Sequence, residues 1–226
     1  MRVQRGLWGL AAALFVAAGA RAEDFRREDL YAFTAPEGWF RAGAPPAGQR
    51  EDARIRKFDL TGIDVLYYDP KSGAVLENLN VVTDAGSLRL ADEQAVEELL
   101  RETAARTGRA LGTMVDVDAT GRRTVGTTEF AYLESRWSHG GQTVRQYQAF
   151  VPGRRHTYIL TFTFAGDDYD KRAELRERVL ASLRLLDGGP PRIWANPLVW
   201  TCLGVPLLAG AGAGMWWWRK RRSRDR

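Results

Sequence analysis

The spacing of apolar residues in the middle of the chain changes between the period of a strand and the period of a helix. Alternation is clearest in HTYILTFTF (156–164), where aromatic residues and leucine fall on one face of a predicted strand and mainly threonines on the other. Residues 92–108 predict a helix that ends at Gly108 and whose apolar face carries Val96, Leu99, Leu100 and Ala104. Residues 168–186 predict a second helix, with a buried side formed by Leu175, Val179, Leu183 and Leu186.

Short runs rich in β-branched and aromatic residues, bounded by turn residues, predict further strands. These runs are DLYAFTAPEGWF (29–40), ARIRKFDL (53–60), IDVLYYDP (63–70) and ENLNVVTD (77–84). Residues 123–137 and 142–151 also alternate, and the SHGG between them predicts a β-hairpin. Because strands and helices occupy separate stretches, the pattern predicts an α+β fold in which helices flank an antiparallel β-sheet.

Residues 1–22 have the pattern of a secretory signal peptide. Two arginines, Arg2 and Arg5, precede an apolar run, and Ala20-Arg21-Ala22 supplies the small residues that a signal peptidase requires. The apolar run is shorter than the roughly 20 residues that a spanning helix needs. The sequence therefore predicts cleavage after Ala22 and export of the domain formed by residues 23–188.

Residues 193–218 contain no charged residue and carry tryptophans toward both ends, as transmembrane helices do at the two headgroup layers. A helix of this length covers the hydrocarbon core of a bilayer. The cluster Arg219–Arg222 follows directly, so the positive-inside rule places the basic tail, residues 219–226, in the cytoplasm. We therefore predict a single-pass protein of the cytoplasmic (inner) membrane, with residues 189–192 as a linker and the N-terminal domain outside.

Two further interpretations of the C-terminal region stay open. Gly210 and Gly214 form a G-x-x-x-G pair, which allows two membrane helices to approach closely and to form a weak homodimer. The glycines before the span, the span and the basic end also resemble a bacterial sorting tail that is removed after export.

The charges show that the basicity belongs to the two ends of the chain. The whole chain has 33 lysines and arginines and 28 acids, for a net charge of +5. Residues 1–22 and 192–226 hold ten of these bases and one acid, so the middle is mildly acidic. This distribution excludes a nucleic-acid partner for the exported domain. The single cysteine, Cys202, lies in the apolar C-terminal stretch and excludes an intramolecular disulfide.

Three features of residues 29–186 resemble the PsbP-like family, whose fold is shared by the extrinsic photosystem II protein and a Ran-binding nuclear import factor. They are the strand that runs into APEGW, the strand ENLNVVTD before a long helix, and the strand HTYILTFTF before a closing helix that finishes VLASLRLL. The resemblance implies an α/β/α sandwich that binds proteins and has no agreed enzymatic activity. The C-terminal span is not part of the usual pattern, and it leaves a role in photosynthesis or nuclear transport without support.

Residues with the chemistry of catalysis or metal binding are few. The chain has two histidines, His139 and His156, both in predicted loops, and it lacks the motifs of common hydrolases. The segment DVDATG (116–121) matches the opening of a calcium loop, but Thr127 stands where the bidentate glutamate is required. We interpret this segment as a turn between strands with solvated acids.

Two other groups of residues are candidates for a site. Carboxylates for acid–base catalysis would come from Asp64, Glu77, Glu129 or Glu134 on strands, where surface exposure is the simpler explanation. An aromatic set could form a binding surface, although packing of the sheet under its helices is the simpler explanation: Tyr67, Tyr68, Tyr132, Trp137 and Tyr147. No residue is assigned as catalytic, cofactor-binding or metal-binding, and no cofactor is predicted.

The sequence thus predicts a membrane-anchored, non-enzymatic binding or assembly module. Its predicted partners are the lipid bilayer, through the C-terminal helix, and a protein or envelope complex outside the cytoplasmic membrane. The alternative is an envelope hydrolase or metal-dependent enzyme with an unfamiliar acidic site.

Overall fold

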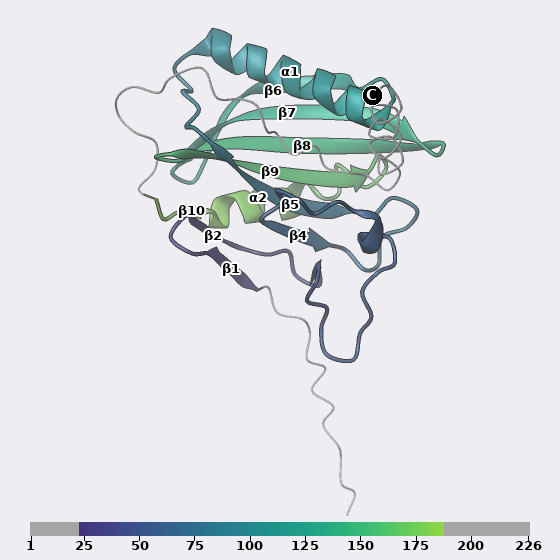
Figure 1. Ribbon diagram of the computed structural model, residues 1–226. Helices are drawn as coiled ribbons and strands as arrows, with labels where there is room; N and C mark the ends of the chain where they lie inside the picture. Colours follow the sequence, from purple (N-terminus) through teal and green to yellow (C-terminus); the bar gives the residue numbers. More distant parts are fainter. Residues whose placement is uncertain (1–22, 188–226) are drawn as a thin grey trace, which may run out of the picture.

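The computed structural model describes residues 23–187 of the 226-residue chain (Figure 1). The predicted signal peptide, linker, transmembrane span and basic tail, the Gly210/Gly214 pair and residue 188 lie outside the described residues. Within residues 23–187, no helix is long and apolar enough to cross a membrane.

Antiparallel strands form two sheets. The larger sheet has seven strands in the order β3-β4-β5-β9-β8-β7-β6, and the smaller sheet has three in the order β1-β2-β10. The strands are β1 Asp24–Arg27, β2 Tyr31–Thr34, β3 Phe40–Arg41, β4 Val65–Tyr68, β5 Asn78–Ala85, β6 Asp116–Val125, β7 Thr128–His139, β8 Gln142–Pro152, β9 His156–Ala165 and β10 Arg184–Leu185. A 3₁₀ helix, η1 (Ile55–Lys57), and two α-helices, α1 (Glu93–Leu111) and α2 (Ala173–Ser182), complete the domain.

The seven-stranded sheet is covered on both faces. Helix α1 lies over one face, while α2 and the small sheet lie against the other (Figure 1). Strand β9 shows the consequence, because Ile159 packs under α1 whereas Tyr158, Leu160 and Phe162 pack toward α2. The predicted α+β fold with an antiparallel sheet and flanking helices is confirmed for the described residues.

Helix α1 buries the predicted apolar residues Val96, Leu99, Leu100 and Ala104. Its N-terminus is capped by Asp92, whose side chain accepts a hydrogen bond from the Ala95 N–H. The predicted end at Gly108 is wrong, because the helix continues to Leu111 and stops where Gly112 adopts a left-handed conformation, with φ of 63°. Gly108 instead leaves room for the Thr113 carbonyl, which would lie 3.0 Å from a Cβ at that position.

Helix α2 is shorter than predicted. Turns occupy residues 168–172, and the chain leaves the helix at Leu183 so that Arg184 and Leu185 can pair with β2. Of the predicted buried side, Val179 and Leu183 are buried, but Leu186 lies beyond the helix and is 37% exposed. Pairing with a distant strand thus ends a helix that local periodicity alone would extend.

Two other predictions of local structure are wrong. Residues 53–60 form η1 and turns instead of a strand, and Ile55 and Phe58 are buried there. The segment 116–121 belongs to β6 and is not a turn, because it pairs with β7 and Asp118 forms a bulge there. The SHGG hairpin is confirmed, with both glycines, Gly140 and Gly141, at positive φ between β7 and β8.

Candidate functional site

The two histidines are not brought together. His139 is exposed at the tip of the β7–β8 hairpin, whereas His156 is half-buried at the start of β9. The 11-residue strand β8 separates these two ends, a distance of about 33 Å at the rise of a strand. A site that uses both imidazoles is therefore excluded by the topology.

The acids of the calcium-like segment are paired with arginines. Asp118 Oδ1 lies 3.3 Å from Arg136 Nε, and Asp118 Oδ2 lies 3.5 Å from Arg145 Nη2. Asp116 lies 3.7 Å from the same Arg136 nitrogen. Among residues 23–187, no group of three or more histidine, cysteine, aspartate or glutamate side chains is arranged to hold a metal ion.

The four candidate carboxylates lie apart from one another. Asp64 and Glu77 stand at opposite ends of the β4–β5 pair, and Asp64 accepts hydrogen bonds from the hydroxyls of Tyr31 and Thr83. Glu129 and Glu134 are both on β7, but their positions differ by an odd number, so they point to opposite faces of the sheet. The four candidate acids therefore do not form a common site.

The structure instead groups Glu77 with Asp69 around a single guanidinium that the sequence did not reveal. Arg172 Nη2 lies 2.7 Å from Glu77 Oε2 and 2.7 Å from Asp69 Oδ2. The Glu77 side chain is 3% exposed, and burial raises its pKa above the ordinary range although the nearby Arg172 charge opposes that shift. This cluster ties the turn between β4 and β5 to the segment before α2.

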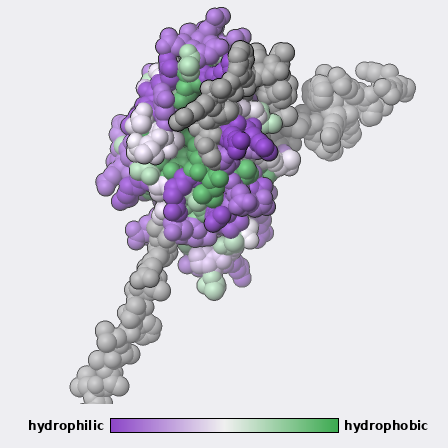
Figure 2. Space-filling model, turned by 90° about the vertical axis from the view of Figure 1, so that its left-hand side faces the viewer, coloured by the Kyte–Doolittle hydropathy of each residue, from purple (hydrophilic) through white to green (hydrophobic). Residues whose placement is uncertain are grey.

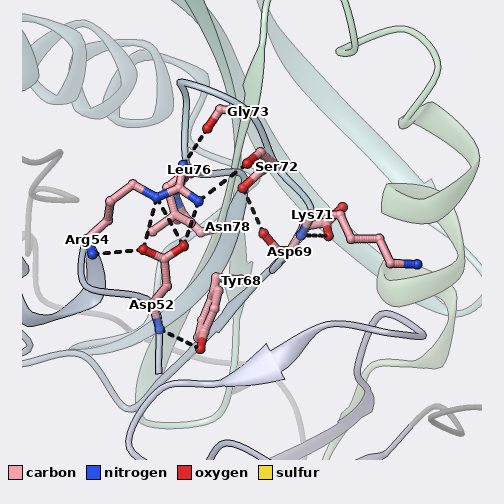
Figure 3. Close-up of polar contacts among 9 residues, drawn as sticks. All are labelled: Asp52, Arg54, Tyr68, Asp69, Lys71, Ser72, Gly73, Leu76 and Asn78. Atoms are coloured by element: carbon pink, nitrogen blue, oxygen red, sulfur yellow. Dashed lines mark hydrogen bonds and ion pairs between the residues drawn. The ribbon is translucent and has the colours of Figure 1, made fainter. Parts of the chain in front are cut away.

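A second arginine secures the other side of the same turn. Figure 3 shows the Arg54 guanidinium against the Asp52 carboxylate, with Arg54 Nη1 donating to the Gly73 carbonyl and Nη2 to the Ser72 carbonyl at 3.3 Å. The Arg54 side chain lowers the pKa of Asp52 by hydrogen bonding to it. The turn is thus held from both sides by arginines, which indicates that these contacts stabilise the fold and do not form a binding site.

Polar side chains also occur in the buried layer beneath α1. Residues on three adjacent strands form two short rows there, all 4% exposed or less: Asn78 and Asn80 on β5, Thr161 and Thr163 on β9, and Gln146 and Gln148 on β8. The amide groups of Gln146 and Gln148 donate to the threonines opposite them, at 3.3 and 3.4 Å. The two asparagines of ENLNVVTD therefore lie inside the fold and not on its surface.

The predicted aromatic set is mainly core. Tyr67, Tyr68, Tyr147 and Trp137 are buried on the two faces of the large sheet, which confirms the packing interpretation for these four. Tyr132 differs, because it is half-buried and stacks on Tyr147 with a centroid distance of 5.6 Å.

Tyr132 belongs to a continuous stack of arginines and tyrosines on the face that α2 covers. Arg176 of α2 lies between two rings, 4.4 Å from the centroid of Tyr147 and 5.0 Å from that of Tyr169, and Arg145 of β8 lies 3.9 Å from Tyr169. Arg123 of β6 also belongs to the group, because it donates two hydrogen bonds to the carboxylate of Glu177, the residue next to Arg176. We call Arg123, Tyr132, Arg145, Tyr147, Tyr169 and Arg176 the arginine–tyrosine layer.

Local sequence explains how the layer forms. Tyr132 can lie flat across β6 because residue 121 is glycine, and a Cβ there would stand 3.0 Å from the Tyr132 ring. Burial raises the pKa of Tyr147 to about 12 and also raises that of Tyr169, so both rings stay neutral and present π faces to the guanidinium groups.

Arg176 is the unusual member of the layer. It is 7% exposed, and its Nε and Nη1 make no hydrogen bond within the described part of the chain. The carboxylate of Glu177 is 3.9 Å from Nε, beyond hydrogen-bond range. At the open rim, Arg145 lies 3.9 Å from Glu134 and 3.5 Å from Asp170, so cations and anions alternate there.

The two-sided sheet, with α1 on one face and α2 with a small sheet on the other, defines a PsbP-like α/β/α sandwich. Among solved structures, the chain is similar to cyanobacterial PsbP (CyanoP) from Synechocystis, at 17% identity and a TM-score of 0.56, over 78% of this chain and 99% of that one. The likeness confirms the PsbP-like fold that the sequence resemblance predicted.

Two further solved structures are similar at lower TM-scores. A protein from Bacteroides thetaiotaomicron has 17% identity and a TM-score of 0.46, over 73% of this chain and 48% of that one. A protein of unknown function from Pseudomonas aeruginosa has 14% identity and a TM-score of 0.41, over 76% of this chain and 99% of that one. No protein-family model and no curated protein sequence matches the chain.

Proposed function

We propose that the protein is not an enzyme but a membrane-anchored, extracytoplasmic binding or assembly module that acts on a protein partner. The signal-peptide pattern of residues 1–22 and the apolar run of residues 193–218 support anchoring at the cytoplasmic membrane with the domain outside. The PsbP-like fold of residues 23–187 supports a binding role, because the resemblance implies a protein-binding sandwich without an agreed activity.

The arginine–tyrosine layer is the observation that carries the proposal. Arginine and tyrosine are the residue types that dominate binding energy at protein interfaces, and here stacking holds them in place before any partner arrives. Tyr132, Arg123 and Arg145 remain partly accessible at its rim. The partner surface that fits this rim is itself polar, with charges of both signs to match the alternating arginines and acids and a flat group for the exposed side of Tyr132.

The test is photo-crosslinking of the full chain in its native envelope. A photoreactive residue replaces Glu174, which is exposed on α2 two residues before Arg176. We expect one dominant adduct, reduced about tenfold or more by Tyr132→Ala or Arg145→Ala, as for interface hot spots. Arg109→Ala is the matched control, because it removes an exposed arginine at the far end of α1 and should leave the adduct unchanged.

Two results would contradict the proposal. An absence of any protein neighbour above background, or equal adducts from wild type and Tyr132→Ala, would remove the layer as a binding surface. For topology, a reporter that is active only outside the cytoplasm, fused after Arg226, should be silent; activity would reverse the proposed orientation.

The enzymatic alternative would need accessible carboxylates beside a pocket. The buried pair Asp69 and Glu77 is instead occupied by Arg172. The candidate carboxylate Asp64 does line a pocket beside β1, but it accepts hydrogen bonds from Tyr31 and Thr83 and lies 3.6 Å from Arg27 Nη2. Because these partners hold Asp64 as a structural acid, we propose no hydrolase or metal-dependent activity.

A further inference from the structure

Three segments that are distant in sequence bring exposed arginines to one end of the domain. They are the turn between β8 and β9, the loop between β5 and α1, and β10 with the residues that follow it (Figure 1, left-hand end). Hydrogen bonds join them, because Gly86 N–H donates to the Arg155 carbonyl at 3.0 Å and Arg154 N–H donates to Asp187 Oδ2 at 2.8 Å. We call the four arginines of this end the basic end: Arg89, Arg154, Arg155 and Arg184.

The members of the basic end are free to bind an external anion. All four are exposed, and within residues 23–187 no carboxylate lies within ion-pair distance of any of them. Most other arginines of the domain are paired, as Arg101 with Glu97 and Arg106 with Glu102 illustrate. The contrast marks this end as a place where four guanidinium groups without an ion pair in the described domain gather.

The acids nearby offset only part of these four positive charges, and none of them forms an ion pair with the four arginines among the described residues. Asp187 is engaged by the Arg154 N–H, and Asp84 is buried at 5% exposure. In the neighbouring β1–β2 turn, Asp29 lies 3.4 Å from Arg26. Figure 2 faces this side of the molecule and shows strongly hydrophilic residues around a narrow apolar band, a surface suited to polar headgroups.

The chain length between this end and the predicted span limits where the basic end can lie. Asp187 is the last described residue, and the span is predicted to begin at residue 193. The intervening residues cover at most about 20 Å even when fully extended. The basic end is therefore the part of the domain that the anchor holds next to the bilayer, a step that rests on the proposed function.

We infer that the basic end docks on the outer surface of the membrane by binding the phosphates of anionic lipid headgroups. Arginine forks bind phosphate oxygens in pairs, and exposed basic residues near an anionic bilayer are attracted to it within about a Debye length of 10 Å. Docking fixes the orientation of the domain relative to the membrane, which the short linker alone does not.

The experiment uses the full chain in vesicles of phosphatidylcholine, alone or mixed with phosphatidylglycerol. In a Cys202→Ser background, a donor dye is attached at Ala91→Cys beside the basic end, and energy transfer to headgroup-labelled lipid reports docking. We expect a docked population in the anionic vesicles that high salt abolishes. Arg154→Gln with Arg155→Gln should lower the docked-to-undocked ratio about tenfold or more.

The matched control is Arg56→Gln with Arg109→Gln, which also removes two exposed arginines without an ion pair among the described residues. Because both double variants change surface positions only, their thermal unfolding should match wild type. Equal transfer in the two kinds of vesicle, or an equal loss in the control, would overturn the inference. Failure of the wild-type chain to float with either kind of vesicle would instead overturn the proposed anchoring, and the inference with it.

Discussion

Arg172→Ala tests whether the buried carboxylates of the β4–β5 turn depend on one guanidinium. Glu77 and Asp69 are 3% and 10% exposed, and each has an oxygen 2.7 Å from Arg172 Nη2. Removing one partner of a fully buried ion pair costs about 3–5 kcal/mol. Because Arg172 is itself 32% exposed and water can replace part of its contact, we expect a loss of about 2–3 kcal/mol at neutral pH.

The loss should depend on pH with a definite sign. Burial raises the pKa of Glu77 above its ordinary value of 4.5, and the Arg172 charge opposes that rise. Above 4.5 the folded state therefore binds more protons than the unfolded state, and stability falls as pH rises through the window up to the folded pKa. Removing Arg172 takes away the charge that opposes the rise, so the folded-state pKa of Glu77 rises further and this pH window widens. The variant should therefore regain stability relative to wild type at a pH low enough to protonate Glu77.

The measurement is guanidinium unfolding followed by circular dichroism, at neutral pH and below 4.5. Arg178→Ala, on the helix that follows Arg172, is the control, because its ion pair with Glu174 is largely exposed and worth less than about 0.5 kcal/mol. In a Glu77→Gln background the cost of Arg172→Ala should shrink by about 1–2 kcal/mol. A loss below about 1 kcal/mol, or one that is the same at both pH values, would refute the reasoning.

Two further predictions concern the arginine–tyrosine layer. Gly121→Ala should cost about 1 kcal/mol in guanidinium unfolding, because the new Cβ would stand 3.0 Å from the Tyr132 ring, whereas its exposed neighbour Thr120→Ala should stay within about 0.5 kcal/mol. Arg176→Met should keep stability within about 1 kcal/mol, since it replaces a buried charge whose Nε and Nη1 make no hydrogen bond, yet it should weaken the envelope crosslink. A stability loss above about 3 kcal/mol would show Arg176 to be structural instead.

The sequence predicted those elements whose signal is local. Strand β9, the β7–β8 hairpin with Gly140 and Gly141, and the buried face of α1 follow from periodicity and turn chemistry within a few residues. Residues 53–60 and the end of α2 were predicted wrongly, because burial of Ile55 and Phe58 in a turn and pairing of β10 with β2 depend on distant partners.

The site was hidden for the same physical reason. Arg145, Arg176 and Tyr169 come from β8, from α2 and from the turn before α2, and only the sheet register and the position of α2 bring them together. One local signal was present: Arg176 falls on the same helical stripe as Val179 and Leu180, where an apolar residue is expected. A charged residue on a buried stripe indicates a specific partner inside the fold.

The positions of the two proposed surfaces constrain the partner. Along β8, the arginine–tyrosine layer extends from Arg145 to Ala149, the residue that pairs with Tyr132. The turn that carries two arginines of the basic end begins at Gly153. At the rise of a strand, Arg145 and Ala149 lie about 26 and 13 Å from the basic end. When the basic end is docked on lipid, the arginine–tyrosine layer lies above the headgroups and faces parallel to the membrane plane. With β8 perpendicular to the bilayer, the proposed partner must extend about 13 Å beyond its surface to reach Tyr132.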